Sequence, residues 1–173
     1  MPVFDASTAE CRVFTFKEGL LSRVAHDLEL DVGRFEVTLE DGEVRATFDP
    51  TSFTVLHALK SGRPDTGALS AKDKAQILEN MRTSVLHPER FPEIAFECDD
   101  VEDEGDSLFL PGSLRLHGVE RSIDVEAQRQ GDSWVAEVSL HQPDFGIKPF
   151  SAMLGAIKVK PTMKVRISVP AED

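Results

Sequence analysis

Histidine is the residue type in this sequence that can serve in the most kinds of site, because its side chain can bind a metal or transfer a proton near neutral pH. The chain carries five histidines. They form neither an HxH pair on a strand nor an HExxH motif on a helix, so their spacing predicts no metal site and we expect no metal ligand. The five are His26, His57, His87, His117 and His141.

The adjacent residues His26 and Asp27 invite comparison with the acid–base pair of a hydrolase. Neighbouring side chains on a strand point to opposite faces, so these two cannot form the orienting hydrogen bond of a catalytic triad. Ser22 would approach His26 only in a helix, and no GxSxG nucleophile turn occurs. A polar start to a strand is the better interpretation, and we expect no catalytic residue.

Charge is distributed unevenly along the chain. Seven carboxylates lie between Glu97 and Asp106, a density typical of a solvated hairpin. The segment 145–170 has five basic residues and no acidic residue, although the formal net charge of the chain is −12. Either this segment is a long connection with its lysines in water, or it is a mobile lid over a ligand. In the second case Lys148 and Lys158 would approach the ligand's head group at the mouth of the site.

Composition and missing motifs exclude several classes of protein. A net charge of −12 repels the phosphate backbone, so we expect no nucleic-acid partner. Neither GxGxxG nor GxxxxGK[ST] occurs, which argues against a nucleotide cofactor. Cys11 and Cys98 lack CxxC spacing, and we expect free thiols, with a single disulfide as the alternative.

The length and the N-terminal residues bear on domain organisation and location. A chain of 173 residues suits a single domain, which we place at residues 1–173. No apolar run approaches the ~18 residues of a membrane-spanning helix, so stable membrane insertion is not expected. Residues 1–5 lack the basic and apolar regions of a signal peptide, which predicts a soluble cytoplasmic protein.

Alternating apolar and polar residues predict a mainly β protein of about eight strands. Apolar residues occupy even positions in 28–32 and odd positions in 35–39, so a bulge or sharp bend is expected at Gly33. Ser70 and Asp73 predict the start of one inserted helix over about 70–84, after a loop at 50–67. The other strand segments are 13–16, 44–48, 94–98, 108–116, 123–127, 134–138 and 163–169.

Short connections make neighbouring strands antiparallel, and one apolar face requires the sheet to close on itself or pack on another sheet. A barrel of ~8 strands is wide enough to hold packed side chains or one small ligand. The residues expected to face an apolar ligand cavity are Leu30, Val44, Ala46, Phe48, Ile94, Phe96, Leu114, Leu116, Val125, Trp134, Ala136 and Phe145.

Three segments in order resemble the YceI-like family. They are Asn80-Met81-Arg82 continuing to Phe91-Pro92-Glu93-Ile94-Ala95-Phe96, then Gly112-Ser113-Leu114-Arg115-Leu116-His117-Gly118-Val119, and Asp144-Phe145-Gly146-Ile147. The resemblance implies a lipocalin-like antiparallel barrel with an elongated apolar cavity. It further implies a bacterial-type carrier of polyisoprenoid or other long-chain lipid; many members are periplasmic or secreted.

The sequence is compatible with three functions. The first is a protein that binds a polyisoprenoid or other lipid for carriage or sequestration, with no cofactor besides that ligand, and it is not an enzyme. The second is a barrel with a filled core that acts as a stress-associated protein-interaction module. Continuous side-chain packing without an elongated cavity would favour this function. The third is an enzyme that uses His26, His57 or His117. Edge strands of a partly open barrel would also allow a homodimer.

Overall fold

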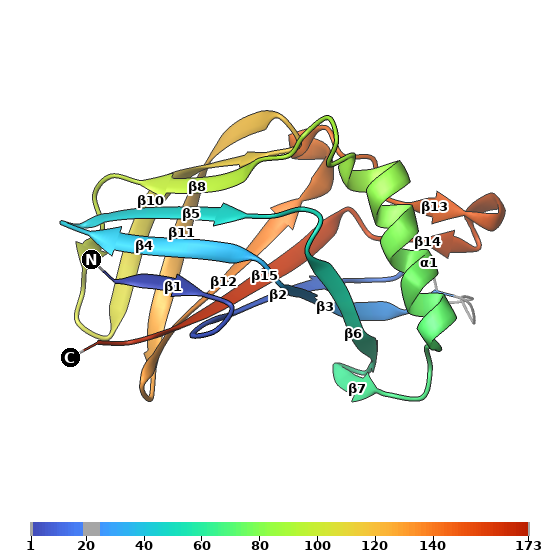
Figure 1. Ribbon diagram of the computed structural model, residues 1–173, viewed down its shortest axis with the longest axis horizontal. Coiled ribbons are helices and arrows are strands. Elements are labelled where there is room, and N and C mark those ends of the chain that lie inside the picture. Colours follow the sequence, from blue (N-terminus) through green and yellow to red (C-terminus); the bar gives the residue numbers. More distant parts are fainter. Residues whose placement is uncertain (1, 19–24, 173) are drawn as a thin grey trace.

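The computed structural model describes residues 2–18 and 25–172 and consists mainly of one large curled sheet (Figure 1). All strand pairings in this sheet are antiparallel, as the short connections predicted. Its strands are β1 (Val3–Asp5), β2 (Glu10–Thr15), β3 (Asp27–Val32), β4 (Phe35–Glu40), β5 (Glu43–Phe48), β6 (Phe53–Lys60), β7 (Arg63–Asp65), β8 (Ile94–Cys98), β9 (Glu102–Asp103), β10 (Ser107–Leu116), β11 (Val119–Gln130), β12 (Ser133–His141) and β15 (Thr162–Pro170).

A bend at Gly33 curls this sheet around one interior. β3 pairs with β2 and β6, whereas β4, directly after the bend, pairs with β5 and β1. The amide of Gly33 donates to the carbonyl of Ser52 at 2.8 Å, and the amide of Asp49 donates to that of Arg34 at 2.9 Å. The bend thus continues as a two-stranded ladder, which confirms the expectation at this glycine. Counting β3–β4 and β5–β6 as two bent strands, the wall has eight strands, and the free edges β1 and β7 leave the barrel partly open.

The expected loop at 50–67 is wrong, because residues Phe53–Lys60 form strand β6. Glu29 pairs with His57 but Leu30 pairs with Val55, so Leu56 is an extra, bulged residue. The bulge changes which side chains face inward partway along the strand. The apolar–polar alternation expected of a strand is therefore interrupted within β6. In addition, the glycines and the proline that follow this strand favoured a loop in the prediction.

Helix α1 (Ala71–Met81) begins at the predicted cap. The amide of Asp73 donates to Oγ of Ser70 at 3.1 Å, and the amide of Ser70 donates to Oδ2 of Asp73 at 2.9 Å. These bonds hold the pKa of Asp73 below its ordinary value. The helix continues as a π-helical turn, η1 (Arg82–Leu86), and crosses one end of the barrel (Figure 1). Within the described ranges, no helix combines the length and apolarity needed to cross a bilayer.

Between β12 and β15 the described chain contains four short elements near the helix end of the barrel. A 3₁₀ turn, η2 (Gln142–Phe145), follows β12 directly. A short hairpin, β13 (Ser151–Ala152) and β14 (Ile157–Lys158), projects beyond α1 (Figure 1), with a turn η3 (Met153–Gly155) between its strands. The amide of Glu18 donates to the carbonyl of Lys158 at 2.7 Å, which joins this hairpin to the segment after β2.

Candidate functional site: an apolar cavity

The barrel encloses a cavity of about 620 Å³. This volume lies within the range of about 300–1,000 Å³ typical of small-molecule sites. Strands from all sides of the wall contribute apolar side chains, because the inward positions of a period-two pattern face the same interior. Of the twelve apolar residues expected at a ligand cavity, all except Phe145 line this one: Leu30, Val44, Ala46, Phe48, Ile94, Phe96, Leu114, Leu116, Val125, Trp134 and Ala136. Their contact with a ligand stays a prediction.

Phe145 and Lys148 lie outside the cavity lining. Phe145 is only 2% exposed, but it sits in the 3₁₀ turn η2, whose backbone accepts a hydrogen bond from His117. Its ring therefore packs in the core beside the β10–β11 turn. Lys148 is exposed after this turn, whereas Lys158 does line the cavity. Of the two lysines predicted at the mouth, Lys158 lines the cavity and Lys148 does not.

The helix supplies lining residues that strand patterns alone do not identify. Ile77 and Met81 of α1, with Val85 and Leu86 of η1, line the cavity from above one end of the barrel. Ile77 and Met81 are four residues apart and share the apolar face of α1, and their role as a cover depends on how the helix crosses the barrel. Phe53 of β6 also lines the cavity and was hidden in the expected loop.

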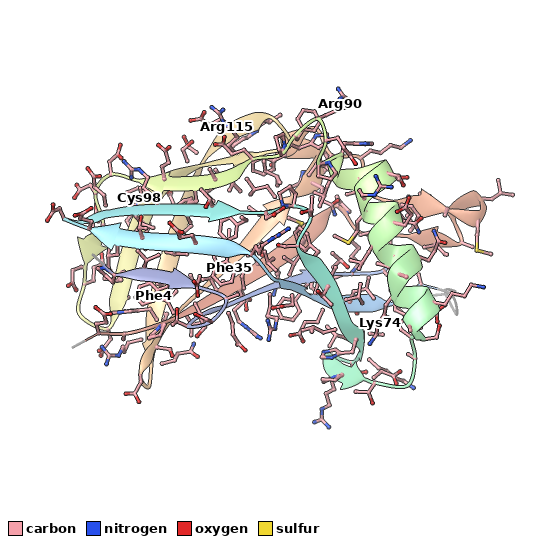
Figure 2. The ribbon with its side chains drawn as sticks, viewed as in Figure 1. Phe4, Phe35, Lys74, Arg90, Cys98 and Arg115 are labelled. Atoms are coloured by element: carbon pink, nitrogen blue, oxygen red, sulfur yellow. The ribbon has the colours of Figure 1, made fainter. Side chains whose placement is uncertain are left out.

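Polar lining residues gather at the helix end of the cavity. They come from the end of β2 and the segment after it, the residue before β3, α1, η2 and β14. The segment after β2 bridges to Val159 after β14, and Gln142 of η2 bonds to Lys160. The opposite end is lined by apolar side chains, including Phe4, which lies in Figure 2 toward the end away from α1. The cavity is therefore polarised along its length, with its polar mouth beside α1 and β14. The polar residues are Thr15, Lys17, His26, Asp73, Gln76, Asn80, Gln142 and Lys158.

Acidic neighbours partly compensate the positive charge of the lysines at this mouth. Nζ of Lys158 lies 3.6 Å from Oε2 of Glu18, and both side chains are about half exposed. The backbone amide of Lys17 donates to Oδ1 of Asp27 at 2.8 Å. Gln142 is 4% exposed, and its Nε2 donates to the carbonyl of Lys160 at 3.1 Å, which fixes the chain that leads from β14 to β15.

Cys11 faces the cavity as an apolar group. The residue is 1% exposed, and burial raises the pKa of its thiol to about 12. A thiol with such a pKa stays protonated at neutral pH and is a poor nucleophile. Cys98 is buried as well, and both cysteines are free, as expected.

The three histidines considered for catalysis have different surroundings. Nε2 of His57 lies 3.0 Å from Oε1 of Glu29 on the outer face of the barrel, and His26 lies at the mouth. The ring centroid of His117 lies 4.2 Å from that of Phe91. Over residues 2–18 and 25–172, no group of three or more histidine, cysteine, aspartate or glutamate side chains is arranged to hold a metal ion.

His117 gives the fold a specific pH dependence. Its Nε2 is buried without a hydrogen-bond partner. Desolvation lowers its pKa below the ordinary 6.5, against the raising effect of its hydrogen bond to the Phe145 backbone, and His87 and Arg90 lower the pKa further. The unfolded chain therefore binds this proton more readily, so the contribution of His117 to stability is fully present above pH 6.5 and is lost as the pH drops below it. We expect His117→Asn, which suits the φ of 54° there, to lose less stability on acidification than the wild type in urea titrations. Equal losses would contradict this role.

Taken together, fold and cavity define a class: a partly open, lipocalin-like antiparallel barrel that encloses an apolar cavity under a helix. Within this class, the chain belongs to the YceI-like domain family, whose family model matches residues 4–171. The comparison with curated proteins found no match.

Solved structures of low sequence identity share the fold. BcnA of Burkholderia cenocepacia is 12% identical with a TM-score of 0.64, over 95% of this chain and 96% of that one. A polyisoprenoid binding domain from Saccharophagus degradans, implicated in plant cell wall breakdown, is 12% identical with a TM-score of 0.60, over 98% and 97%. The Campylobacter jejuni YCEI protein is 11% identical with a TM-score of 0.54, over 91% and 90%.

Proposed function

We propose that this protein binds a long-chain apolar ligand, a polyisoprenoid or another lipid, inside the barrel and carries or sequesters it. The observation that carries the proposal is the cavity of about 620 Å³, apolar along its length and polar only at the mouth. This polarity orients an amphipathic chain, with its tail in the barrel and its head near Lys158. The Saccharophagus degradans domain, which shares the fold, is a polyisoprenoid binding domain, and this supports the ligand class.

The apolar lining favours an apolar occupant. Each methylene of a chain buried in this space contributes about 0.8 kcal/mol, so a long chain gains more than a short one. The interaction module with a filled core requires side chains in this space, and the described residues do not fill it.

Native and denaturing mass spectrometry of the purified chain test the proposal. We expect an excess mass in the native spectrum that disappears on denaturation, with an apolar compound in the extract. Protein stripped of ligand should then take up geranylgeraniol or palmitic acid. A native mass equal to the bare chain, together with no uptake of either probe, would refute the proposal.

Lys158 should attract an anionic head group of the ligand through its positive charge. We expect Lys158→Ala to weaken binding of palmitate about three- to tenfold, a modest effect because the amine is half exposed and near Glu18. Binding of the uncharged hexadecanol should change little. Lys148→Ala is the matched control, because Lys148 is exposed and outside the lining. Fluorescence titration of the three proteins measures the effect, and equal weakening for both ligands would contradict this orientation.

A further inference from the structure

The tip of the β13–β14 hairpin exposes two large apolar side chains. Met153 is 64% exposed and Leu154 is fully exposed, more than any other large hydrophobic residue that the structure describes. Neither side chain lines the cavity. The hairpin projects from the mouth end of the barrel (Figure 1), while its base, through Phe150 and Ile157, does line the cavity. The tip is therefore an apolar surface beside the mouth.

The backbone of this tip is unfavourable for the residues that occupy it. Met153 has a φ of 52° and Leu154 a φ of 56°, in the left-handed region that is uncommon for bulky residues. Asparagine or glycine would fit the same turn with less strain and without exposing apolar surface. Strained residues of this kind occur at functional sites. The fold of the barrel therefore gives no reason for apolar side chains at this tip.

Basic residues accompany the apolar tip. Lys148 and Lys160, at the base of the hairpin, are exposed, and no described carboxylate lies within 4.0 Å of either amine. Lys158, between them, is compensated by Glu18. The whole segment 145–170 has five basic residues and no acidic one, in a chain of net charge −12. This local reversal favours an anionic partner.

We propose that the hairpin docks on the surface of an anionic lipid bilayer. Met153 and Leu154 enter the interface, Lys148 and Lys160 face the headgroups, and the cavity mouth is brought to the membrane. Aromatic or aliphatic side chains beside lysines are typical of proteins that lie on membranes. A protein partner fits less well, because two side chains are far from the ~800 Å² per partner that a stable interface buries. The docking goes beyond ligand binding and does not depend on which ligand the cavity takes.

Vesicle co-sedimentation of the full chain tests the docking. We expect binding to vesicles of phosphatidylcholine with phosphatidylglycerol, weaker binding to phosphatidylcholine alone, and release by salt. Leu154→Asn should reduce binding about tenfold or more, because it removes one leucine side chain from the interface. Asparagine suits the left-handed turn, so the variant should fold. Val3→Thr is the control, because Val3 is 47% exposed in β1, toward the other end of the barrel.

The outcomes separate the docking from ligand binding. Loss of vesicle binding by Leu154→Asn, with the ligand mass in native spectra unchanged, supports the docking. Failure of the wild type to bind anionic vesicles, or equal binding by Leu154→Asn and Val3→Thr, overturns it, whether or not the cavity holds a ligand. A wild type that sediments as a dimer, with Leu154→Asn a monomer, would show that the tip is an interface between copies, and would also overturn it.

Discussion

Ala136→Phe should weaken ligand binding about a hundredfold or more while making the unliganded protein more stable. Ala136 on β12 lies opposite Ala127 on β11, and both small side chains line the cavity. A phenyl ring at this position would occupy the space that a ligand chain needs. Excluding about four methylenes at about 0.8 kcal/mol each lowers affinity about a hundredfold or more. The same ring fills empty apolar volume in the unliganded protein, so we expect a gain of about 1–2 kcal/mol in its free energy of unfolding.

Val135→Phe is the matched control for this substitution. Val135 is the preceding residue on β12, and its side chain lies on the outer face of the barrel beside Glu137 and Gln128. We expect this variant to bind geranylgeraniol as the wild type does. Titration with geranylgeraniol and urea unfolding of stripped protein measure the two effects. Ala136→Phe protein that still binds the probe at wild-type affinity would show that the ligand does not occupy the middle of the barrel.

The wall of the barrel is predictable from the sequence because its strands follow a period of two. The change from even to odd apolar positions at Gly33 identified the bend that curls the sheet. Inward positions such as Leu30 and Phe96 then followed from the pattern, since alternate residues of a strand share a face. The helix start at Ser70 was equally predictable, because a capping box is a local interaction between residues three apart.

The mouth is not predictable in the same way. Lys17, Asp73 and Lys158 are far apart in the sequence and meet only because α1 crosses the barrel end and β14 joins the segment after β2. Irregular segments have no regular alternation of inward and outward side chains. The sequence pattern therefore could not distinguish Lys158, which lines the cavity, from Lys148, which does not. Phe145 was expected to line the cavity but does not. The reason is the same, because it sits in a 3₁₀ turn rather than a strand.

Gly112→Ala should destabilise the barrel by about 3 kcal/mol or more. Gly112 lies on β10, where a Cβ atom would overlap the carbonyl oxygen of Glu97 and come within 2.5 Å of Cζ of Phe96. The oxygen belongs to the backbone of β8, which pairs with β10, so neither strand can move away cheaply. Overpacking of a fitted core costs about 1–3 kcal/mol, and the backbone contact adds to it. At about 2–4 °C per kcal/mol, the melting temperature should fall by roughly 6–12 °C.

Two further variants identify which contact causes this loss. Gly67→Ala is the control, because a Cβ atom there meets nothing within 4 Å, and we expect nearly unchanged stability. Phe96→Leu removes the ring that Gly112 accommodates, and by itself it should be mildly destabilising. If the ring clash matters, Gly112→Ala should cost less in the Phe96→Leu background than in the wild type, a coupling that a double-mutant cycle measures. Equal costs in both backgrounds would assign the loss to the approach of β8 and β10 alone, and the ring of Phe96 would then not be the reason for glycine at this position.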